Sequence, residues 1–243
     1  MKGENKDAAV MLICLPHAGG TPAIYSGWAD ALEPHIRVVA TQPRRPASGQ
    51  PMTLRQSAAD LAEELAPTVS EPYAFFGNSL GAIVAFETTR ALSDQGHRPP
   101  LRLFACGSAP PAMAAAAGRN LRSLPDDEFL SEVSRMGELP REILDEPELQ
   151  QEFLPGLRGD YSLAETYEYV PGSPLPCPIS VFRGLSDALV DPAKLELWGE
   201  HTTQDVKIRA LPGNHFLTQT SATFLHRAIR KDLELDMRRA RKE

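Results

Sequence analysis

Short apolar runs alternate with segments of helical periodicity along most of this chain. The runs that we expect to form strands are 10–15, 36–40, 73–76, 101–106, 179–182 and 206–211. Between or after these runs, segments 24–32, 54–65, 80–92, 193–200 and 219–233 repeat apolar residues every three or four positions, which indicates helices. Such alternation is typical of a parallel sheet with helices on both faces. The sequence therefore predicts the α/β fold class with a mostly parallel sheet.

The alternation stops between about 109 and 176, where the pattern becomes mostly helical. A helix start at Pro125 is followed by two short amphipathic pieces at 140–144 and 148–157. The length of 243 residues fits one domain of this class, for which about 200–250 residues are common. We therefore expect one domain over residues 1–243 with a helical insertion at about 109–176.

The charge balance and the cysteines exclude several classes of protein. With 25 Lys and Arg against 32 Asp and Glu, the net charge is −7 and the body of the chain has no basic block, so a nucleic-acid-binding protein is not expected. The apolar run at 8–15 is too short for a membrane helix. Three cysteines without metal-ligand spacing, Cys14, Cys106 and Cys177, favour a reducing compartment. We expect a cytoplasmic protein with no membrane segment, metal or cofactor.

The pattern Gly77-Asn78-Ser79-Leu80-Gly81 lies where an expected strand meets an expected helix. In that context G-x-S-x-G forms a sharp turn that presents the serine hydroxyl at the carboxyl end of the strand, and the two glycines keep side chains out of the turn. A purely structural turn is the alternative, but the flanking strand and apolar helix match the catalytic arrangement. We predict that Ser79 is a nucleophile.

A serine nucleophile needs a general base that is oriented by an acid, and in this topology the chain order is serine, acid, histidine. Of six histidines, His215 alone follows an expected strand in the required position. Asp187 lies in the loop after the strand expected at 179–182 and can reach the imidazole. Asp191 is the alternative acid, although Pro192 after it is typical of a helix N-cap. We favour Asp187 because the carboxylate should follow its strand by only a few residues.

Acyl transfer also requires hydrogen-bond donors for the developing oxyanion. The backbone N–H of Leu80, directly after the expected nucleophile, is one candidate. The second should come from the loop after an early strand, and His17-Ala18-Gly19-Gly20 is such a loop. A glycine turn with no further role is the alternative. We predict that the N–H groups of Ala18 and Leu80 form the oxyanion hole.

Several segments together carry a family resemblance that spans residues 10 to about 230. They are Pro16-His17-Ala18-Gly19-Gly20 with Trp28 after it, Phe76-Gly77-Asn78-Ser79-Leu80-Gly81-Ala82, Phe86-Glu87 and Gly213-Asn214-His215-Phe216. This set resembles the type II thioesterases, the stand-alone editing enzymes of non-ribosomal peptide synthetases and polyketide synthases. The segments 107–110 and 157–161 resemble the borders of that family's lid.

The resemblance implies an α/β-hydrolase fold with Ser79 as nucleophile, His215 as base and Asp187 as acid. It implies an enzyme that cleaves acyl thioesters from the phosphopantetheine arms of acyl or peptidyl carrier domains and so removes stalled or misprimed groups. The insertion would be a lid over the acyl group. Its apolar side chains either pack in a helical hairpin or contact the substrate, and Phe129 and Met136 are the candidates for substrate contact.

The chain departs from the family's usual pattern near the expected site. Asn78 stands where histidine is common, and its side chain is not expected to touch the chemistry. Pro43-Arg44-Arg45-Pro46 replaces a P-G-R-G loop beside the pocket, so we expect a different substrate preference. Arg44 and Arg45 are also candidates for a basic rim that faces acidic carrier domains. The basic C-terminal tail from 226 onward is interpreted as a solvated helix end.

Two other functions remain open from the sequence. A carboxylester hydrolase or an acyltransferase would use the same Ser-His-Asp triad, because fold and triad are shared across many functions. A carrier-binding protein without activity is the other alternative, against which the complete set of Ser79, Asp187 and His215 argues. In each case we expect a monomer.

Overall fold

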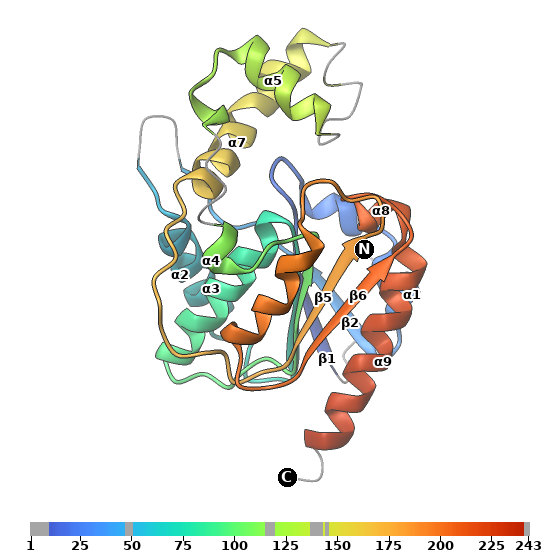
Figure 1. The fold of residues 1–243 in the computed structure, drawn as a ribbon. Helices are drawn as coiled ribbons and strands as arrows, with labels where there is room; N and C mark the ends of the chain where they lie inside the picture. The colour runs from blue at the N-terminus through green and yellow to red at the C-terminus, as the bar shows by residue number, and fades with distance from the viewer. Residues whose placement is uncertain (1–9, 47–50, 115–119, 137–142, 144–145, 241–243) are drawn as a thin grey trace.

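The computed structural model describes residues 10–46, 51–114, 120–136, 143 and 146–240, and its centre is a parallel β-sheet (Figure 1). Within these residues the strands are β1 (Val10–Leu15), β2 (Ile36–Ala40), β3 (Tyr73–Asn78), β4 (Leu103–Cys106), β5 (Ile179–Gly184) and β6 (Val206–Leu211). They pair in the order β2-β1-β3-β4-β5-β6, and each pair is parallel. The α/β class and the expected strands are confirmed, although one end of β3, β4 and β5 differs by two residues.

The direction in which the chain adds strands reverses beside β1. From β1 the chain runs to the edge strand β2, returns to β3 on the other side of β1, and continues outward to β6. Leu15 at the end of β1 is in register with Gly77 near the end of β3, so the loops that follow both strands leave the sheet side by side. Ligands of open α/β sheets bind at such a reversal, at the carboxyl ends of the strands. The topology therefore brings the loop at 16–20 next to Ser79.

Helices cover both faces of the sheet, because alternate residues of a strand point to opposite faces. The odd-numbered residues of β1 pack with residues of α2 (Leu54–Leu65), α3 (Leu80–Asp94) and the 3₁₀ helix η3 (Pro192–His201). Its even-numbered residues pack with residues of α1 (Trp28–Leu32) and α9 (Ala222–Ala240). All of β1 is buried, as is usual for a central parallel strand.

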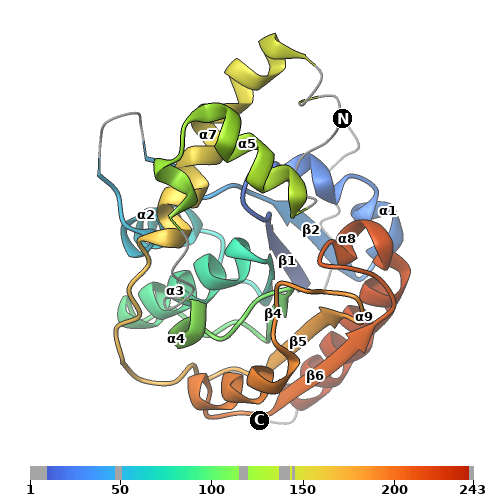
Figure 2. The same cartoon turned by 45° about the horizontal axis from the view of Figure 1, so that its top comes forward.

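Helical elements connect β4 to β5. They are α4 (Pro111–Ala114), η2 (Leu121–Ser123), α5 (Asp126–Arg135) and α7 (Pro147–Glu165). Figures 1 and 2 show α5 and α7 above the carboxyl edge of the sheet. The helix expected at 148–157 is longer in the structure: α7 continues past Pro155 because its second half buries Leu157, Tyr161 and Leu163, which outweighs the lost backbone hydrogen bond. Of the piece expected at 140–144, all but Ile143 lies outside the described residues.

Three expected helices differ in detail. The helix expected at 24–32 is divided into η1 (Pro22–Tyr25) and α1, because Gly27 between them is left-handed with φ 83°. The last helix is divided into α8 (Leu217–Thr220) and α9 at Ser221, whose φ is −141°. The segment after Asp191 is the 3₁₀ helix η3 rather than an α-helix. In the described part of the chain, no helix combines the length and apolar character that a membrane span requires.

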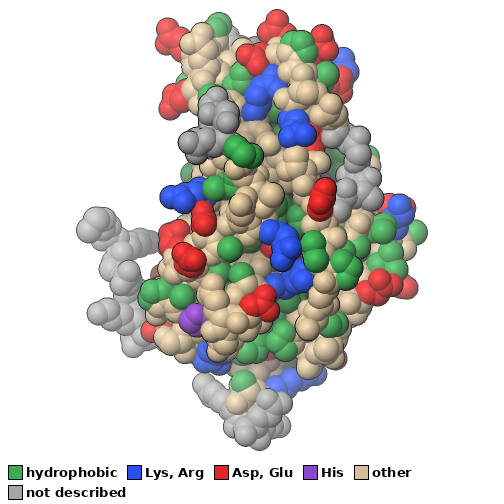
Figure 3. Space-filling model, turned by 90° about the vertical axis from the view of Figure 1, so that its left-hand side faces the viewer, with side chains coloured by type: hydrophobic (Ala, Val, Ile, Leu, Met, Phe, Trp, Pro, Cys, Tyr) green, Lys and Arg blue, Asp and Glu red, His purple; other side chains and the backbone are tan. Residues whose placement is uncertain are grey.

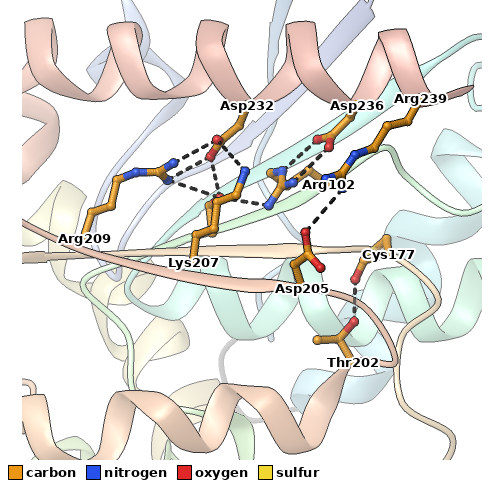
Figure 4. Close-up of polar contacts among 10 residues, drawn as sticks. Arg102, Cys177, Thr202, Asp205, Lys207, Arg209, Asp232, Asp236 and Arg239 are labelled. Atoms are coloured by element: carbon orange, nitrogen blue, oxygen red, sulfur yellow. Dashed lines mark hydrogen bonds and ion pairs between the residues drawn. The ribbon is translucent and has the colours of Figure 1, made fainter.

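A buried ion pair joins α9 to the sheet (Figure 4). Arg102, directly before β4, is fully buried and donates to both carboxylate oxygens of Asp236, at 2.7 and 2.9 Å, and to Ser180 Oγ at 3.1 Å. This bidentate geometry compensates the desolvation of both charges. The C-terminal segment is therefore more than the solvated helix end expected from its charges, because its acidic side chains face the sheet.

Asp232, one turn before Asp236 on α9, is the centre of a second group of charges. It accepts hydrogen bonds from Ser180 at 2.7 Å, from Lys207 at 3.0 Å and from Arg209 at 2.8 Å. Burial would raise the pKa of Asp232, but the hydrogen bonds from Arg209, Ser180 and Lys207 lower it to about 2. The unfolded chain therefore takes up the proton first as the pH falls. The stabilisation is fully present above the ordinary pKa of aspartate and is lost as the pH falls toward 2.

We expect Asp232→Asn to lower the free energy of unfolding at neutral pH by about 2 kcal/mol, because Lys207 and Arg209 lose the charge they face. The difference from wild type should shrink as the pH falls from about 4 to about 2. Urea unfolding followed by circular dichroism at several pH values measures both. Asp205→Asn is the matched control, because the Asp205–Arg239 pair is exposed and contributes less than about 1 kcal/mol. Equal losses in the two variants would contradict a special role for the buried group.

Candidate active site

Ser79 occupies a strained turn between β3 and α3. Its φ is 52° and its ψ is −115°, and it is the one non-glycine residue with positive φ in the described part of the chain. A Cβ atom on Gly77 would lie 2.3 Å from the Gly81 carbonyl oxygen, and one on Gly81 would lie 2.4 Å from the Leu15 carbonyl oxygen. The Ser79 N–H donates to the Cys106 carbonyl at 2.7 Å, which holds the turn against β4. The turn thus requires both glycines and places Ser79 at the carboxyl end of β3.

His215 and Asp187 meet at the same edge of the sheet. Asp187 follows β5, His215 follows the neighbouring strand β6, and His215 Nδ1 lies 3.0 Å from Asp187 Oδ2. When Nδ1 carries the proton toward the carboxylate, Nε2 is left as the acceptor. Nε2 is buried without a hydrogen-bond partner among the described residues, and Ser79 and His215 line the same cavity. The imidazole is therefore held by an acid at one nitrogen, and its other nitrogen is available to a group in the cavity.

The environment of Asp187 favours its ionised form. Burial would raise the pKa of Asp187, but the hydrogen bond and the charge of His215, with the backbone N–H groups of Leu189 and Val190, lower it below its usual value. The Leu189 N–H lies 2.9 Å from Asp187 Oδ1. Asp191, the alternative acid, instead accepts from the Ala193 N–H at 3.0 Å and caps η3. Of the two acids, the structure brings Asp187 to the histidine.

The loop after β1 adds free backbone donors to this edge. A hydrogen bond of 2.9 Å from the Gly20 N–H to the His17 carbonyl closes a tight turn over residues 17–20. Ala18 and Leu80 line the same cavity as Ser79. Among the described residues, no group accepts a hydrogen bond from the N–H of Ala18 or of Leu80. The Leu80 N–H is also at the N-terminus of α3, where the helix dipole favours negative charge.

The cavity at this site has a volume of about 400 Å³ and a mainly apolar lining. The helical segment between β4 and β5 contributes Ala114, Met136, Tyr161 and Ala164 to its wall. Met136 thus lies where a substrate contact was expected, whereas Phe129 does not line the cavity. The ring of Phe129 is fully buried, packs edge-to-face on Tyr161 and lies under the Arg158 guanidinium, so it packs the interior of the segment. Clusters of His, Cys, Asp or Glu suited to a metal do not occur in the described ranges.

Comparison with known proteins agrees with this geometry. The family model of the thioesterase domain matches residues 11–233. The chain belongs to the thioesterase family. The gramicidin S biosynthesis protein GrsT of Aneurinibacillus migulanus is 32% identical to it over 235 residues, which cover 95% of this chain and 91% of GrsT.

Two solved structures are also similar to this thioesterase. ClbQ from the colibactin NRPS/PKS pathway has 31% sequence identity and a TM-score of 0.86, and the match covers 95% of this chain and 99% of ClbQ. The type II thioesterase BorB from the borrelidin biosynthetic cluster has 31% identity and a TM-score of 0.81, and the match covers 95% of this chain and 96% of BorB. The family and the α/β-hydrolase fold that the sequence resemblance implied are therefore confirmed.

His17 is a residue of the thioesterase site to which the sequence assigned no separate role. Its ring is buried, lies edge-on to Phe216, and has Nδ1 3.3 Å from Asn78 Nδ2. Burial, and then the nearby charge of His215, lower the pKa of His17 to about 4. The Asn78 amide therefore lies beside a neutral His17 at the carboxyl edge of the sheet. The Asn214 side chain accepts a hydrogen bond from the Phe216 N–H at 2.9 Å.

The arginines expected to form a basic rim have acidic partners in the thioesterase. Arg44 pairs with Asp60 at 3.1 Å on the surface, and Arg45 pairs with the buried Asp160 of α7 at 2.6 Å. Figure 3 shows Lys and Arg side chains on the side of α2 and α3 mixed with Asp and Glu rather than gathered in a uniform basic patch. The half-buried Arg45 is thus held by a buried acid rather than free on the surface. No local sequence pattern pairs positions 115 residues apart, so the sequence alone does not reveal the Arg45–Asp160 pair.

We expect His17 to stay neutral in the folded thioesterase until the pH falls to about 4. Since the unfolded chain takes up the proton first, the stabilising contribution of neutral His17 is present above about pH 6.5 and is lost as the pH falls toward 4. A titration of ring-nitrogen NMR signals, with His17→Gln to assign the resonance, measures this pKa. A midpoint above pH 6 would contradict the buried, neutral state.

Proposed function

We propose that this thioesterase hydrolyses acyl thioesters on the phosphopantetheine arms of acyl and peptidyl carrier domains, and so removes stalled or misprimed groups from non-ribosomal peptide and polyketide assembly lines. The observation that carries the proposal is the buried Asp187–His215 pair, which shares an apolar cavity with the strained Ser79. The relatives support it, since BorB is a type II thioesterase and ClbQ comes from an NRPS/PKS pathway.

In the proposed reaction Ser79 Oγ attacks the thioester carbonyl carbon while its proton moves to His215 Nε2. The C–S bond then breaks, and the thiol of the pantetheine arm leaves with the proton from His215. Water attacks the acyl-Ser79 ester with His215 again as base, which releases the carboxylic acid and restores the serine. Asp187 holds the imidazole and stabilises its protonated form in both halves of the reaction. The hydrogen bond between Ser79 Oγ and His215 Nε2 forms when the substrate closes the site, as is common in hydrolases.

The N–H groups of Ala18 and Leu80 receive the oxyanion in this proposal. Neither donates to another described group, so both are available when charge develops on the carbonyl oxygen. Backbone donors fixed in advance need no reorganisation at that moment, and an apolar cavity strengthens their effect. These are the same two donors that the sequence predicts for the oxyanion hole.

The proposal includes the domain organisation expected from the sequence. Residues 1–243 form one α/β-hydrolase domain, and the insertion at about 109–176 is its lid. Met136, Tyr161 and Ala164 of the lid supply apolar surface to the cavity wall, which suits the acyl group of the substrate. The partners are carrier domains, and the enzyme acts as a cytoplasmic monomer. Carboxylester hydrolysis or acyl transfer by the same triad is not favoured, because the chain belongs to the thioesterase family and BorB is a type II thioesterase.

We expect Ser79→Ala to slow release of short acyl groups from acyl-pantetheine carriers by at least about 1,000-fold, because the nucleophile is lost. Mass spectrometry of the carrier measures the acyl loading directly. Ser93→Ala is the matched control, since Ser93 lies on the same helix with its hydroxyl bonded to the Thr89 carbonyl and does not line the cavity. Unchanged loading with the wild-type enzyme across a range of chain lengths would refute the proposed function. Faster cleavage of oxygen esters than of every thioester would favour a carboxylester hydrolase.

Two asparagine substitutions separate the acid from the helix cap. Asp187→Asn should lower kcat by about 10³- to 10⁴-fold, because the imidazole loses the carboxylate that selects its tautomer. Asp191→Asn should leave kcat within about twofold, because asparagine caps a helix about as well as aspartate. Steady-state kinetics on one acyl thioester compares them. An inactive Asp191→Asn beside an active Asp187→Asn would reverse the assignment.

A further inference from the structure

The loop that presents the Ala18 N–H is held by a side chain of the lid. Asp160 of α7 is buried, and its Oδ2 accepts a hydrogen bond of 2.7 Å from the Gly19 N–H. Gly19 is the residue directly after Ala18 and has φ +75°. A Cβ atom on Gly19 would lie 2.6 Å from Leu157 Cδ1, so α7 packs directly against the backbone of the loop. The loop after β1 and the helix above the cavity are therefore in contact through both a hydrogen bond and apolar packing.

Arg45 completes this connection from a third segment, the one between β2 and α2. Its guanidinium is bidentate on Asp160, with Nε 2.7 Å from Oδ1 and Nη2 2.6 Å from Oδ2. The same Nη2 atom donates to the Gly20 carbonyl at 3.1 Å, and Gln42 Nε2 donates to that carbonyl at 3.0 Å. The N–H of Gly19 and the C=O of Gly20 are thus both bound by side chains from outside the loop. We call Asp160 and Arg45 with these two backbone groups the loop clamp.

The loop clamp fixes the direction of the Ala18 N–H. In a planar trans peptide the N–H points opposite to the C=O, so the Ala18 N–H points opposite to the His17 carbonyl. The His17 carbonyl accepts from the Gly20 N–H at 2.9 Å, which closes the turn. Because the clamp binds the two residues that complete this turn, it holds the His17–Ala18 peptide in one orientation. The Asp160 carboxylate binds the residue next to Ala18, where an unpaired negative charge would oppose a developing oxyanion, and the Arg45 fork compensates that charge.

We infer that Asp160 and Arg45 are positioning residues for the oxyanion hole. Through these two side chains, α7 fixes the direction of the Ala18 N–H. The inference rests on the proposed function, because it concerns the rate of the same acyl transfer. Neither side chain is assigned a contact with the reacting atoms. An ion pair that only held the lid in place would affect stability or substrate binding, whereas the loop clamp acts on the transition state.

The test measures kcat and KM for a short acyl thioester of N-acetylcysteamine with Asp160→Asn and Arg45→Gln. Misaligning one oxyanion donor should lower kcat by about 10- to 100-fold, while KM changes by less than about threefold. Affinity for a trifluoromethyl ketone, whose adduct with Ser79 carries an oxyanion, should fall by the same factor as kcat/KM. Affinity for an unreactive amide analogue of the substrate should stay within about twofold.

Matched controls separate the loop clamp from ion pairs in general. Asp126→Asn removes the pair with Arg158 on the same lid helix, and Arg37→Gln removes the pair with Glu71 from an arginine about as exposed as Arg45. Both should leave kcat within about twofold. The double variant of Asp160 and Arg45 should be no slower than the slower single variant, because the two residues act as one unit.

Three results would overturn the inference. They are an unchanged kcat in both single variants, a loss confined to KM, and independent effects that multiply in the double variant. If Asp160→Asn does not fold, Arg45→Lys is the deciding variant. Lysine keeps the positive charge but loses the bidentate hydrogen bonds of the guanidinium. The inference then requires a lower kcat in Arg45→Lys with an unchanged thermal unfolding midpoint. Failure of the proposed function looks different, since the wild-type enzyme would then release no acyl group and Ser79→Ala would change nothing.

Discussion

The parallel pairing of β1 with β3 is the constraint on which the site depends. Because the strand order reverses there, the loop after β1 and the turn after β3 leave the same edge next to each other, with Leu15 and Gly77 in register. The turn at Ser79 then fits only with glycine at two positions, one of which touches the end of β1. The positions of Ser79 and of the Ala18 and Leu80 N–H groups are therefore consequences of one strand register. Asp187 and His215 lie at the same edge because β5 and β6 are also parallel neighbours.

Three ion pairs that contain a buried charge each join segments that are distant in sequence. The Asp187–His215 pair joins the loops that follow β5 and β6. The Asp160–Arg45 pair joins α7 to the segment between β2 and α2. The Arg102–Asp236 pair joins the start of β4 to α9. A buried charge without its partner is costly, so each pair restricts how its two segments can move. The first two pairs lie around the cavity and the third on the opposite side of the fold. Polar interactions thus fix geometry that the apolar core alone would leave adjustable.

The strands could be predicted, and the residues of the candidate site could be named, because both are local in sequence. β1, β2 and β6 have the bounds expected from the pattern. β1 is a central parallel strand that is buried on both faces, so it is a continuous apolar run in the sequence. β2 and β6 are edge strands and are only partly buried. Helix boundaries were less certain. The pattern at 24–32 did not reveal that Gly27 would be left-handed, and the helical piece expected at 148–157 continues to Glu165 as α7 because its second half is packed. Phe129 and Met136 looked equivalent as apolar lid residues, and only their places in the packed segment separate them.

The sequence by itself determined the fold class, because the alternation of strand and helix patterns runs along most of the chain. It also predicted Ser79, His215 and the Leu80 N–H as site groups, because each lies in a short motif at a strand end. It also favoured Asp187 over Asp191 on spacing. Tertiary structure alone decided that Asp191 caps η3, that Arg45 faces inward, and that Asp160 binds the Gly19 N–H across 141 residues of chain. The physical reason is that hydrogen bonds and ion pairs depend on distance in space, and no local periodicity records which distant segments the sheet and the lid bring together.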